Sequence, residues 1–280
     1  MFNAKILKDS INKFGIRLIS MEITFPRFIL AEVNTHRVFS RNSASSRAIP
    51  IEKMIEKVQT NPFYPIYWGK NQKGMQAKQE LNDEEAALAK YEWQHAINEA
   101  ILRVKNLSKI GVHKQTANRL LEPFLWHTAI ISSTEWENWD SLRDHKDAQP
   151  EIKMMAQIMK ECRSKSSPKL LQPGDWHLPL VRENELEEIE SIYGAMGAPM
   201  ISSGRCCRVS YLTHNGERDL KADLDLCNTL VKDGHMSPME HPAMCTEEQN
   251  FIGNFKSWKQ YRKMLPNESV FSNNEIEIKI

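Results

Sequence analysis

The 280-residue sequence lacks the signatures of several large protein classes. No apolar run is long enough to span a membrane, and the N-terminus has no apolar signal-peptide core. Its five cysteines include no CxxC pair, so zinc-ribbon spacing is missing and a disulfide framework is not expected. The net charge is only +1, which argues against a general nucleic-acid-binding protein. We therefore expect a cytoplasmic protein with reduced thiols that binds neither membranes nor nucleic acid.

Motifs of common catalytic and nucleotide-binding folds are missing as well. No GxGxxG follows an expected strand, and the sequence contains no GxxxxGK[ST], GxSxG or zinc deaminase pattern. His235 and His241 are separated by six positions with Pro238 between them, so they do not share a helix face as the histidines of HExxH do. We therefore predict no metal site.

The composition supports a packed core, because 41% of the residues are hydrophobic and 26% are charged. Residues 16–25 alternate apolar and polar side chains, which predicts a half-buried strand. Pro26 suits the first position of a helix over residues 27–37. A long helix is predicted over 82–111, because Asn82 is followed three residues later by a glutamate in a capping-box pattern.

The rest of the chain predicts an α+β class. The expected elements are a helical block over about 113–163, a loop over 164–180, an acidic helix over 182–197, a short strand over 204–213, an amphipathic helix over 219–234 and an aromatic, basic helix over 250–271. This order predicts one domain over 1–280, with an antiparallel or mixed sheet and packed helices. Its pieces are a strand–helix–loop unit at 16–50, a helical insertion at about 82–163 and a second strand–helix unit at about 204–270.

The stretch THRVFSRNSASSRAIP, residues 35–50, is rich in groups that bind anions. It contains three arginines, a histidine, an asparagine and five hydroxyl side chains. Guanidinium forks and serine hydroxyls fit phosphate oxygens, so Ser45 and Arg47 are candidates to hold one phosphate. His36 and Arg37 are candidates to face a second anion or a flat ring. The alternative is a solvated, serine-rich surface turn.

Other candidates lie further along the chain. Arg119 sits among apolar residues, which indicates either a structural ion pair or a position facing a polar cavity. Trp136 and Trp139 are expected in the core, with stacking on a ligand ring as the alternative. In GHMSPMEH, a loop that touches a cofactor through His235 and Ser237 fits better than a metal site.

Together these stretches resemble the flavin-dependent thymidylate synthases. That family is marked by RHR, then seven residues, then Ser, with Arg two positions later. The matching residues here are Thr35, His36, Arg37, Asn42, Ser45 and Arg47. NRLLEP and NWDSLR resemble further family motifs and supply Arg119, Pro123, Asn138 and Arg143. CRVSY and GHMSPMEH resemble the family's ARVS and GHxTPFEH elements.

The order of these motifs differs from most members of the family. ARVS and GHxTPFEH usually precede RHR, whereas their counterparts here lie at 207–241, so the chain resembles a circularly permuted, phage-type member. SWKQYRKMLPNE also resembles the RHR region through Arg262, Asn267 and Glu268, which a partial duplication would explain. Two positions depart from the pattern: Thr35 replaces the first arginine of RHR, and Ser43 replaces a glutamate.

The resemblance implies the fold of the thymidylate synthase complementing proteins and the reductive methylation of dUMP to dTMP. Methylenetetrahydrofolate would supply the carbon, and NADPH would reduce a bound FAD. The residues implied in substrate binding are Glu32, Ser45, Arg47, Arg119 and Arg143. Arg143 would be the catalytic residue, stabilising negative charge on the uracil ring without an enzyme nucleophile. The residues implied in FAD binding are Thr35, His36, Arg37, Asn42, Asn138, His235 and Ser237.

The family also implies a homotetramer whose active sites are shared between subunits. Two other functions stay open from the sequence: a non-catalytic nucleotide- or nucleic-acid-binding relative, and a relative that modifies another pyrimidine nucleotide. Bound flavin would separate the enzyme from the non-catalytic alternative. The loop GDWH, Gly174 to His177, has no role assigned by any motif.

Overall fold

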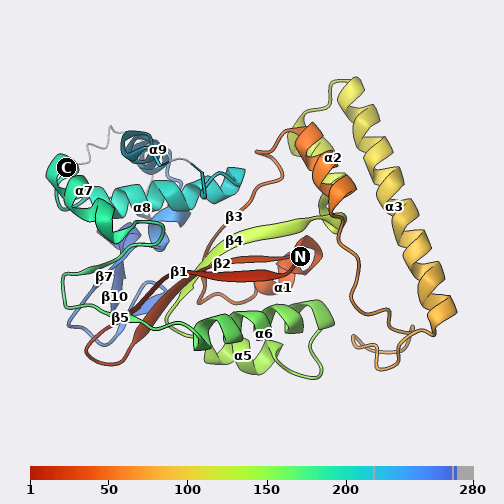
Figure 1. Ribbon diagram of the computed structural model, residues 1–280, viewed down its shortest axis with the longest axis horizontal. Coiled ribbons are helices and arrows are strands. Elements are labelled where there is room, and N and C mark those ends of the chain that lie inside the picture. Colours follow the sequence, from red (N-terminus) through yellow and green to blue (C-terminus); the bar gives the residue numbers. More distant parts are fainter. Residues whose placement is uncertain (217, 267, 270–280) are drawn as a thin grey trace.

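The computed structural model describes residues 1–216, 218–266 and 268–269. A sheet of five strands lies at its centre (Figure 1). The strands are β1 (Asn3–Ile11), β2 (Arg17–Pro26), β3 (Ser40–Ser43), β4 (Trp126–Ser133) and β5 (Lys169–Leu170). Their order is β3-β4-β2-β1-β5, and every pair is antiparallel except β1 with β5. The expected α+β class with a mixed sheet is confirmed, whereas the division into one domain stays a prediction.

Strand β4 corrects the prediction of a helical block over 113–163. Around it the structure has α4 (Lys114–Ala117), the 3-10 helix η2 (Asn118–Phe124), α5 (Glu137–Arg143) and α6 (Pro150–Ser164). Residues 129–133 of β4 are buried on both faces of the sheet, so the strand shows little apolar–polar alternation. A short apolar run of this kind cannot be told from a buried helix by periodicity.

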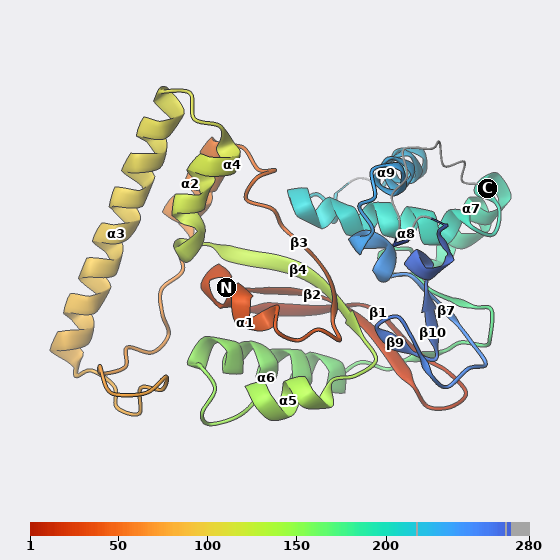
Figure 2. The same ribbon diagram turned by 180° about the vertical axis from the view of Figure 1, so that it is seen from behind.

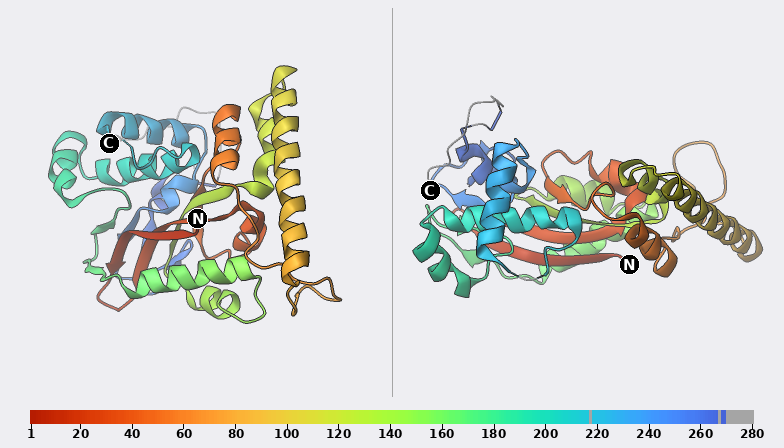
Figure 3. Two further views of the ribbon diagram at one scale, coloured as in Figure 1. Left: turned by 45° about the vertical axis from the view of Figure 1, so that its right-hand side comes forward. Right: turned by 90° about the horizontal axis from the view of Figure 1, so that it is seen from above.

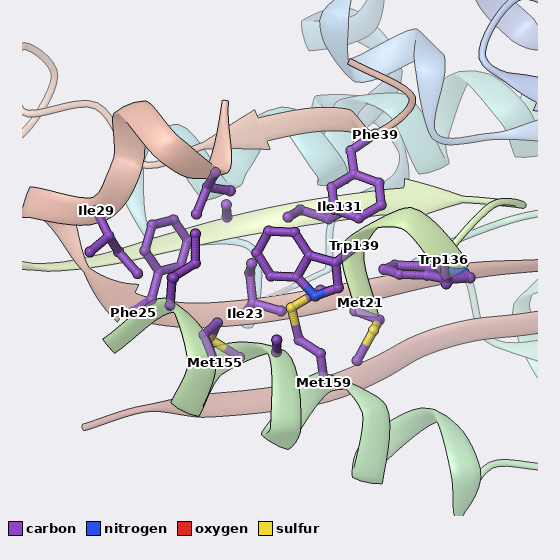
Figure 4. Close-up of a cluster of buried hydrophobic side chains, with 14 of the residues drawn as sticks. Met21, Ile23, Phe25, Ile29, Phe39, Ile131, Trp136, Trp139, Met155 and Met159 are labelled. Carbon is purple, nitrogen blue, oxygen red and sulfur yellow. The ribbon is translucent and has the colours of Figure 1, made fainter. Parts of the chain in front are cut away.

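Strand β2 is confirmed, but both of its faces are buried rather than one. On one face, Met21 and Ile23 pack against Met155 and Met159 of α6 and against Trp139 of α5 (Figure 4). The opposite face carries polar residues that are nevertheless enclosed by later parts of the chain. Trp139 is 1% exposed, so its predicted core position is confirmed, and Trp136 belongs to the same cluster.

The second face of the sheet is covered by α8 (Gly197–Cys207) and the 3-10 helix η4 (Arg208–Tyr211). The predicted strand over 204–213 is therefore wrong. Gly204 explains the helical packing, because a Cβ atom there would lie 2.1 Å from the backbone oxygen of Asp223 on α9 (Leu220–Lys232). That close approach of two helices is a tertiary contact that strand periodicity does not reveal.

The C-terminal region contains one further correction. The acidic helix is confirmed as the 3-10 helix η3 (Glu183–Glu185) followed by α7 (Leu186–Tyr193), and the amphipathic helix as α9. The predicted helix over 250–271 is wrong: the chain forms β8 (Phe251–Ile252), β9 (Phe255–Lys256), β10 (Trp258–Gln260) and the 3-10 helix η6 (Tyr261–Met264). Gly253 and Ser257 have positive φ angles of 78° and 65° and turn the chain between these short strands.

The long helix α3 (Asp83–Lys109) is confirmed with its Asn82–Glu85 capping box. Ile97, Ile101 and Val104 attach it to α2 (Ile51–Thr60) and η2. The helix stands at the end of the molecule opposite to α7 and α9 (Figures 2 and 3). Within the described residues, no helix combines the length and apolar character needed to cross a membrane.

A buried polar network connects the central sheet to the later segments. In the loop predicted over 164–180, His177 of β6 (Trp176–His177) contacts Ser10 Oγ and Ser20 Oγ, each at 2.9 Å. Ser20 Oγ lies 2.5 Å from Ser132 Oγ, which contacts His241 Nδ1 at 2.8 Å. All five side chains are fully buried. The GDWH stretch therefore joins β1 and β2 to the small sheet of β10, β7 (Ala243–Cys245) and β6.

Candidate active site

Residues 27–50, which include the stretch rich in anion-binding groups, form a short helix, a turn, strand β3 and a loop. The predicted helix over 27–37 is shorter than expected: a 3-10 turn, η1 (Arg27–Ile29), continues into α1 (Leu30–Val33). Pro26 ends β2 and precedes η1 instead of occupying the first position of a long helix. After β3, the backbone N–H of Ser45 donates to the carbonyl of Ser210 at 3.1 Å, so η4 positions the serine-rich loop.

This loop forms one wall of a cavity of about 320 Å³. The residues that line the cavity are Arg27, Leu30, Ser43, Ala44, Ser45, Ser46, Arg47, Arg119 and His127. Three residues predicted to bind the nucleotide, Ser45, Arg47 and Arg119, are therefore brought together, although Arg119 is 72 residues from Arg47 in the chain. The cavity is polar and cationic, as an anion site requires.

Glu122 holds the arginines of this cavity in place. Its Oε1 accepts from Ser46 Oγ at 2.6 Å and from Arg119 at 2.7 Å, and it lies 2.9 Å from Arg27. Burial alone would raise the pKa of Glu122, but the Ser46 hydrogen bond and the positive charges of Arg27 and Arg119 keep that pKa below its ordinary value. Both expectations for Arg119 are met, because it forms an ion pair and also lines a cavity.

Arg27 and His127 were not among the sequence candidates. Arg27 donates to His127 Nδ1 at 2.8 Å across the end of the β2–β4 pair, where Phe25 is opposite His127. His127 is 2% exposed, and burial together with the charge of Arg27 lowers its pKa to about 3. A sequence signal for Arg27 exists, since it is the one charged residue in the apolar run FPRFIL. His127 lies in β4, where the sequence pattern predicts a helical block instead.

Arg143 belongs to a different cluster. Its guanidinium donates to His36 Nε2 at 2.8 Å, to Thr35 Oγ1 at 3.1 Å and to the carbonyl of Glu32 at 3.4 Å. His36 is buried, and burial followed by the charges of Arg143 and Arg41 lowers its pKa to about 4, so the ring is a neutral acceptor. Glu32 and Arg143 do not line the cavity of Ser45, Arg47 and Arg119.

Some of the residues predicted to contact flavin are hydrogen-bonded within the chain, and several are exposed. Asn42 donates to the carbonyl of Cys206 at 2.8 Å and accepts from Ser237 Oγ at 3.3 Å, which joins β3 to the 3-10 helix η5 (Ser237–Glu240). Thr35, Arg37, Asn138, His235 and Ser237 are exposed, although Asn138 hydrogen-bonds His36 and Thr35 accepts from Arg143. His235 and His241 do not come together in a metal site, and the described part of the chain holds no group of three His, Cys, Asp or Glu that could bind a metal.

The exposed residues suit a flavin that binds at the surface. A guanidinium, an amide and an imidazole are the donor types that carbonyl and pyrophosphate oxygens of a flavin nucleotide require. Arg37 forms no side-chain hydrogen bond or ion pair among residues 1–216, 218–266 and 268–269, so its charge is free for a ligand. Arg37 precedes β3 and His235 precedes η5, and the Asn42–Ser237 contact joins β3 to η5. The donor types of these residues therefore fit a flavin nucleotide.

The possible second copy of the motif is engaged within the chain. Arg262 donates to Glu240 Oε1 at 2.5 Å, and its Nε lies 3.8 Å from Glu268. Asn267 lies outside the described residues. Arg262 and Glu268 therefore brace η6 against η5, while duplication and circular permutation stay predictions.

Comparison with known proteins identifies the class to which this fold and cavity belong. A family model described as thymidylate synthase complementing protein matches residues 16–169, more than half of the chain. The chain belongs to the thymidylate synthase complementing protein family. The matched region contains the whole cavity and the Arg143 cluster, whereas α7, α8 and α9 lie beyond it.

Two similar solved structures are those of the UMP/dUMP methylase PolB from Streptomyces cacaoi, bound with 5-Br dUMP in one and with 5-Br UMP in the other. Both are 13% identical to this chain, with TM-scores of 0.48 and 0.47. Each alignment covers 59% of this chain, and it covers 90% of the first and 89% of the second methylase chain. No curated protein matches the chain in sequence.

Proposed function

We propose that the protein is a flavin-dependent thymidylate synthase that converts dUMP to dTMP. Methylenetetrahydrofolate would be the carbon donor and NADPH the reductant. The observation that carries the proposal is the meeting of Ser45, Arg47 and Arg119 on one cavity in a chain of the thymidylate synthase complementing protein family. Membership supports the reaction class, and the cavity supports a phosphorylated substrate.

The chain's own residues would position the nucleotide phosphate. The hydroxyl of Ser45 and the guanidinium of Arg47 offer donors from the loop, and Arg119 offers a second guanidinium from η2. Because Glu122 already holds Arg119, little side-chain freedom is lost when a ligand binds. Such preorganisation favours affinity for a phosphate dianion.

A flavin would be held by Arg37, Asn138 and His235, while the Asn42–Ser237 contact would fix β3 against η5. When bound, FAD would supply the hydride chemistry that no amino-acid side chain provides. Asn42 and Ser237 satisfy each other in this structure, so we assign them to positioning rather than to direct contact.

Arg143 would act on the uracil ring of a substrate bound to a neighbouring subunit. Its absence from the lining of this chain's own cavity supports that assignment. A homo-oligomer, expected to be a tetramer, is supported by α3, which exposes Leu88, Tyr91 and Leu102 on one helical face. Antiparallel pairing of two α3 helices would also place the acidic first turn against the basic last turn.

The proposal is tested by the absorption spectrum of the purified protein and by a dTMP formation assay. We expect a yellow protein with flavin absorption bands, and dTMP formation that requires dUMP, methylenetetrahydrofolate and NADPH together. A colourless protein that cannot be loaded with FAD would contradict the enzyme assignment.

One observation favours the alternative of a non-catalytic nucleotide-binding relative. Arg143 is bound to His36, Thr35 and Glu32, and Thr35 and Ser43 stand where the family pattern has arginine and glutamate. A protein that binds dUMP but shows no NADPH-dependent flavin bleaching would support this alternative. Turnover of a different pyrimidine nucleotide in place of dUMP would support the other alternative, a relative that modifies that nucleotide.

A further inference from the structure

We propose that Arg27 and His127 form a second, inner half of the anion site and donate hydrogen bonds to oxygens of the bound phosphate group. This inference deepens the proposed function, because it rests on a phosphorylated ligand in the same cavity. Neither residue belongs to the motifs that pointed to Ser45, Arg47 and Arg119. Both line the same cavity as those three residues.

Arg27 is held rigidly and still has donors left for a ligand. Its side chain is 13% exposed, with one terminal nitrogen on His127 Nδ1 at 2.8 Å and the other 2.9 Å from Glu122. Its backbone N–H donates to the carbonyl of Leu125 at 2.8 Å. A guanidinium has about five N–H donors, so roughly three remain after these two side-chain contacts. A bracing ion pair alone would not place those donors on a cavity wall.

The contact with Arg27 decides where the proton of His127 lies. A guanidinium only donates, so Nδ1 of His127 must accept, and the neutral ring carries its proton on Nε2. Nε2 is buried and has no hydrogen-bond partner among the residues that the structure describes. His127 lines the cavity of Ser45, Arg47 and Arg119, and it also lines a smaller pocket of about 20 Å³ together with Lys57 and Trp126. A ligand oxygen would satisfy this orphaned donor.

The charge state of the pair favours a phosphate over a neutral ligand. Burial and Arg27 keep the imidazole neutral, so His127 contributes a donor without a charge of its own. Arg27, Arg47 and Arg119 line the cavity, while the nearby carboxylate of Glu122 compensates only part of their charge. Arg27 and His127 therefore add a charged guanidinium and a neutral N–H donor to the donors of Ser45, Arg47 and Arg119.

The test is calorimetric titration of the full-length protein with inorganic phosphate and with dUMP. The variants are Arg27→Met, Arg27→Lys, His127→Phe and His127→Gln, with Arg103→Met as the control. Arg103 is paired with Glu99 on the exposed side of α3, away from the cavity. We expect Arg27→Met and His127→Phe to lower the affinity for both ligands about tenfold to a hundredfold, as expected for loss of a hydrogen bond to a charged group.

The conservative variants separate ligand binding from packing. His127→Gln keeps an N–H donor near the position of Nε2 and should recover part of the lost affinity. Arg27→Lys keeps the positive charge but loses the forked guanidinium, so this variant should still bind both ligands more weakly than the unchanged protein. In protein with ¹⁵N-labelled histidine, the Nε2–H resonance of His127 should shift when phosphate is added. A purely structural role would leave that resonance in place.

The outcomes distinguish this inference from the proposed function. If folded Arg27 and His127 variants bind phosphate and dUMP as tightly as the unchanged protein, the inference is overturned. The proposed function then stands if Arg47→Ala still lowers the affinity for dUMP. Phosphate binding that depends on Arg27 and His127, without turnover of dUMP, supports the inference and contradicts the proposed function. Absence of binding to either ligand in the unchanged protein overturns both.

Discussion

Acidification from pH 7.5 to pH 5 should destabilise this protein through its buried histidines. His127 and His241 are 2% and 0% exposed, and burial is the first cause that lowers the pKa of each to about 3. In the unfolded chain a histidine titrates near 6.5. Below that value the unfolded state binds more protons than the folded state, so the free energy of unfolding falls as pH falls from about 6.5 towards 3.

The magnitude follows from the distance between pH 5 and the unfolded pKa. That distance is about 1.5 pH units, and each unit corresponds to roughly 1.36 kcal/mol. His127 and His241 should therefore each remove on the order of 2 kcal/mol at pH 5. His177 is fully buried, and its pKa is also held well below the ordinary value by burial, so it acts in the same direction. A total stability is typically only about 5–15 kcal/mol, so the loss should be easy to measure.

The assay is urea unfolding followed by tryptophan fluorescence at pH 7.5, 6 and 5, with the urea dependence compared at each pH. His241→Asn keeps a side-chain acceptor for Ser132 but cannot take up a proton. We expect this variant to lose about 2 kcal/mol less between pH 7.5 and 5 than the unchanged protein, whatever its stability at pH 7.5. His145→Asn is the control, because His145 is exposed.

A flat stability profile between pH 7.5 and 5 would refute this reasoning. It would mean that the histidines take up protons at about the same pH in the folded state as in the unfolded chain, as they would if the Ser10–His177–Ser20–Ser132–His241 network were open to water. An equal pH dependence in His241→Asn and the unchanged protein would remove His241 in particular from the explanation.

Three further predictions concern the site and the assembly. Arg47→Ala should weaken dUMP binding about tenfold by calorimetry, as expected for loss of one charge-assisted contact, and unchanged affinity would remove Arg47 from the site. Arg143→Ala should lower turnover at least a hundredfold while moving the thermal midpoint by only a few degrees, because its side chain is partly exposed. If it unfolds the protein instead, Arg143 is a structural residue. Light scattering should show a multiple of the 32.5 kDa chain, and Leu88→Glu with Leu102→Glu should shift that mass downwards if α3 forms the interface.

Local sequence signals predicted well those elements whose stabilising contacts are local. The capping box of Asn82 and Glu85 marks the start of α3, and both reciprocal hydrogen bonds form. Strand β2 was also predicted correctly, although its alternation suggested one buried face and the structure buries two. These patterns depend on neighbours within a few residues, so they can be read without knowing the fold.

Prediction failed where distant partners decide the conformation. Residues 126–133 form a central strand because β2 and β3 pair with both of its edges. Residues 204–207 belong to α8, and Gly204 lets this helix approach the backbone of α9. Residues 250–271 contain short strands instead of a helix, with β10 paired to β7. Each of these contacts lies far away in sequence, and helical or strand periodicity carries no information about it.

The candidate site divides in the same way. The residue types of an anion site can be read from the sequence, because Ser45 and Arg47 stand at a spacing that suits one phosphate and Arg119 is a lone cation among apolar neighbours. The folded chain is needed to show that Arg119 joins Ser45 and Arg47, that Arg27 and His127 line the same cavity, and that Arg143 belongs to another cluster. The physical reason is that a cavity is made by side chains from separate elements. Pairing of β2 with β4 and the ion pairs of Glu122 bring them together.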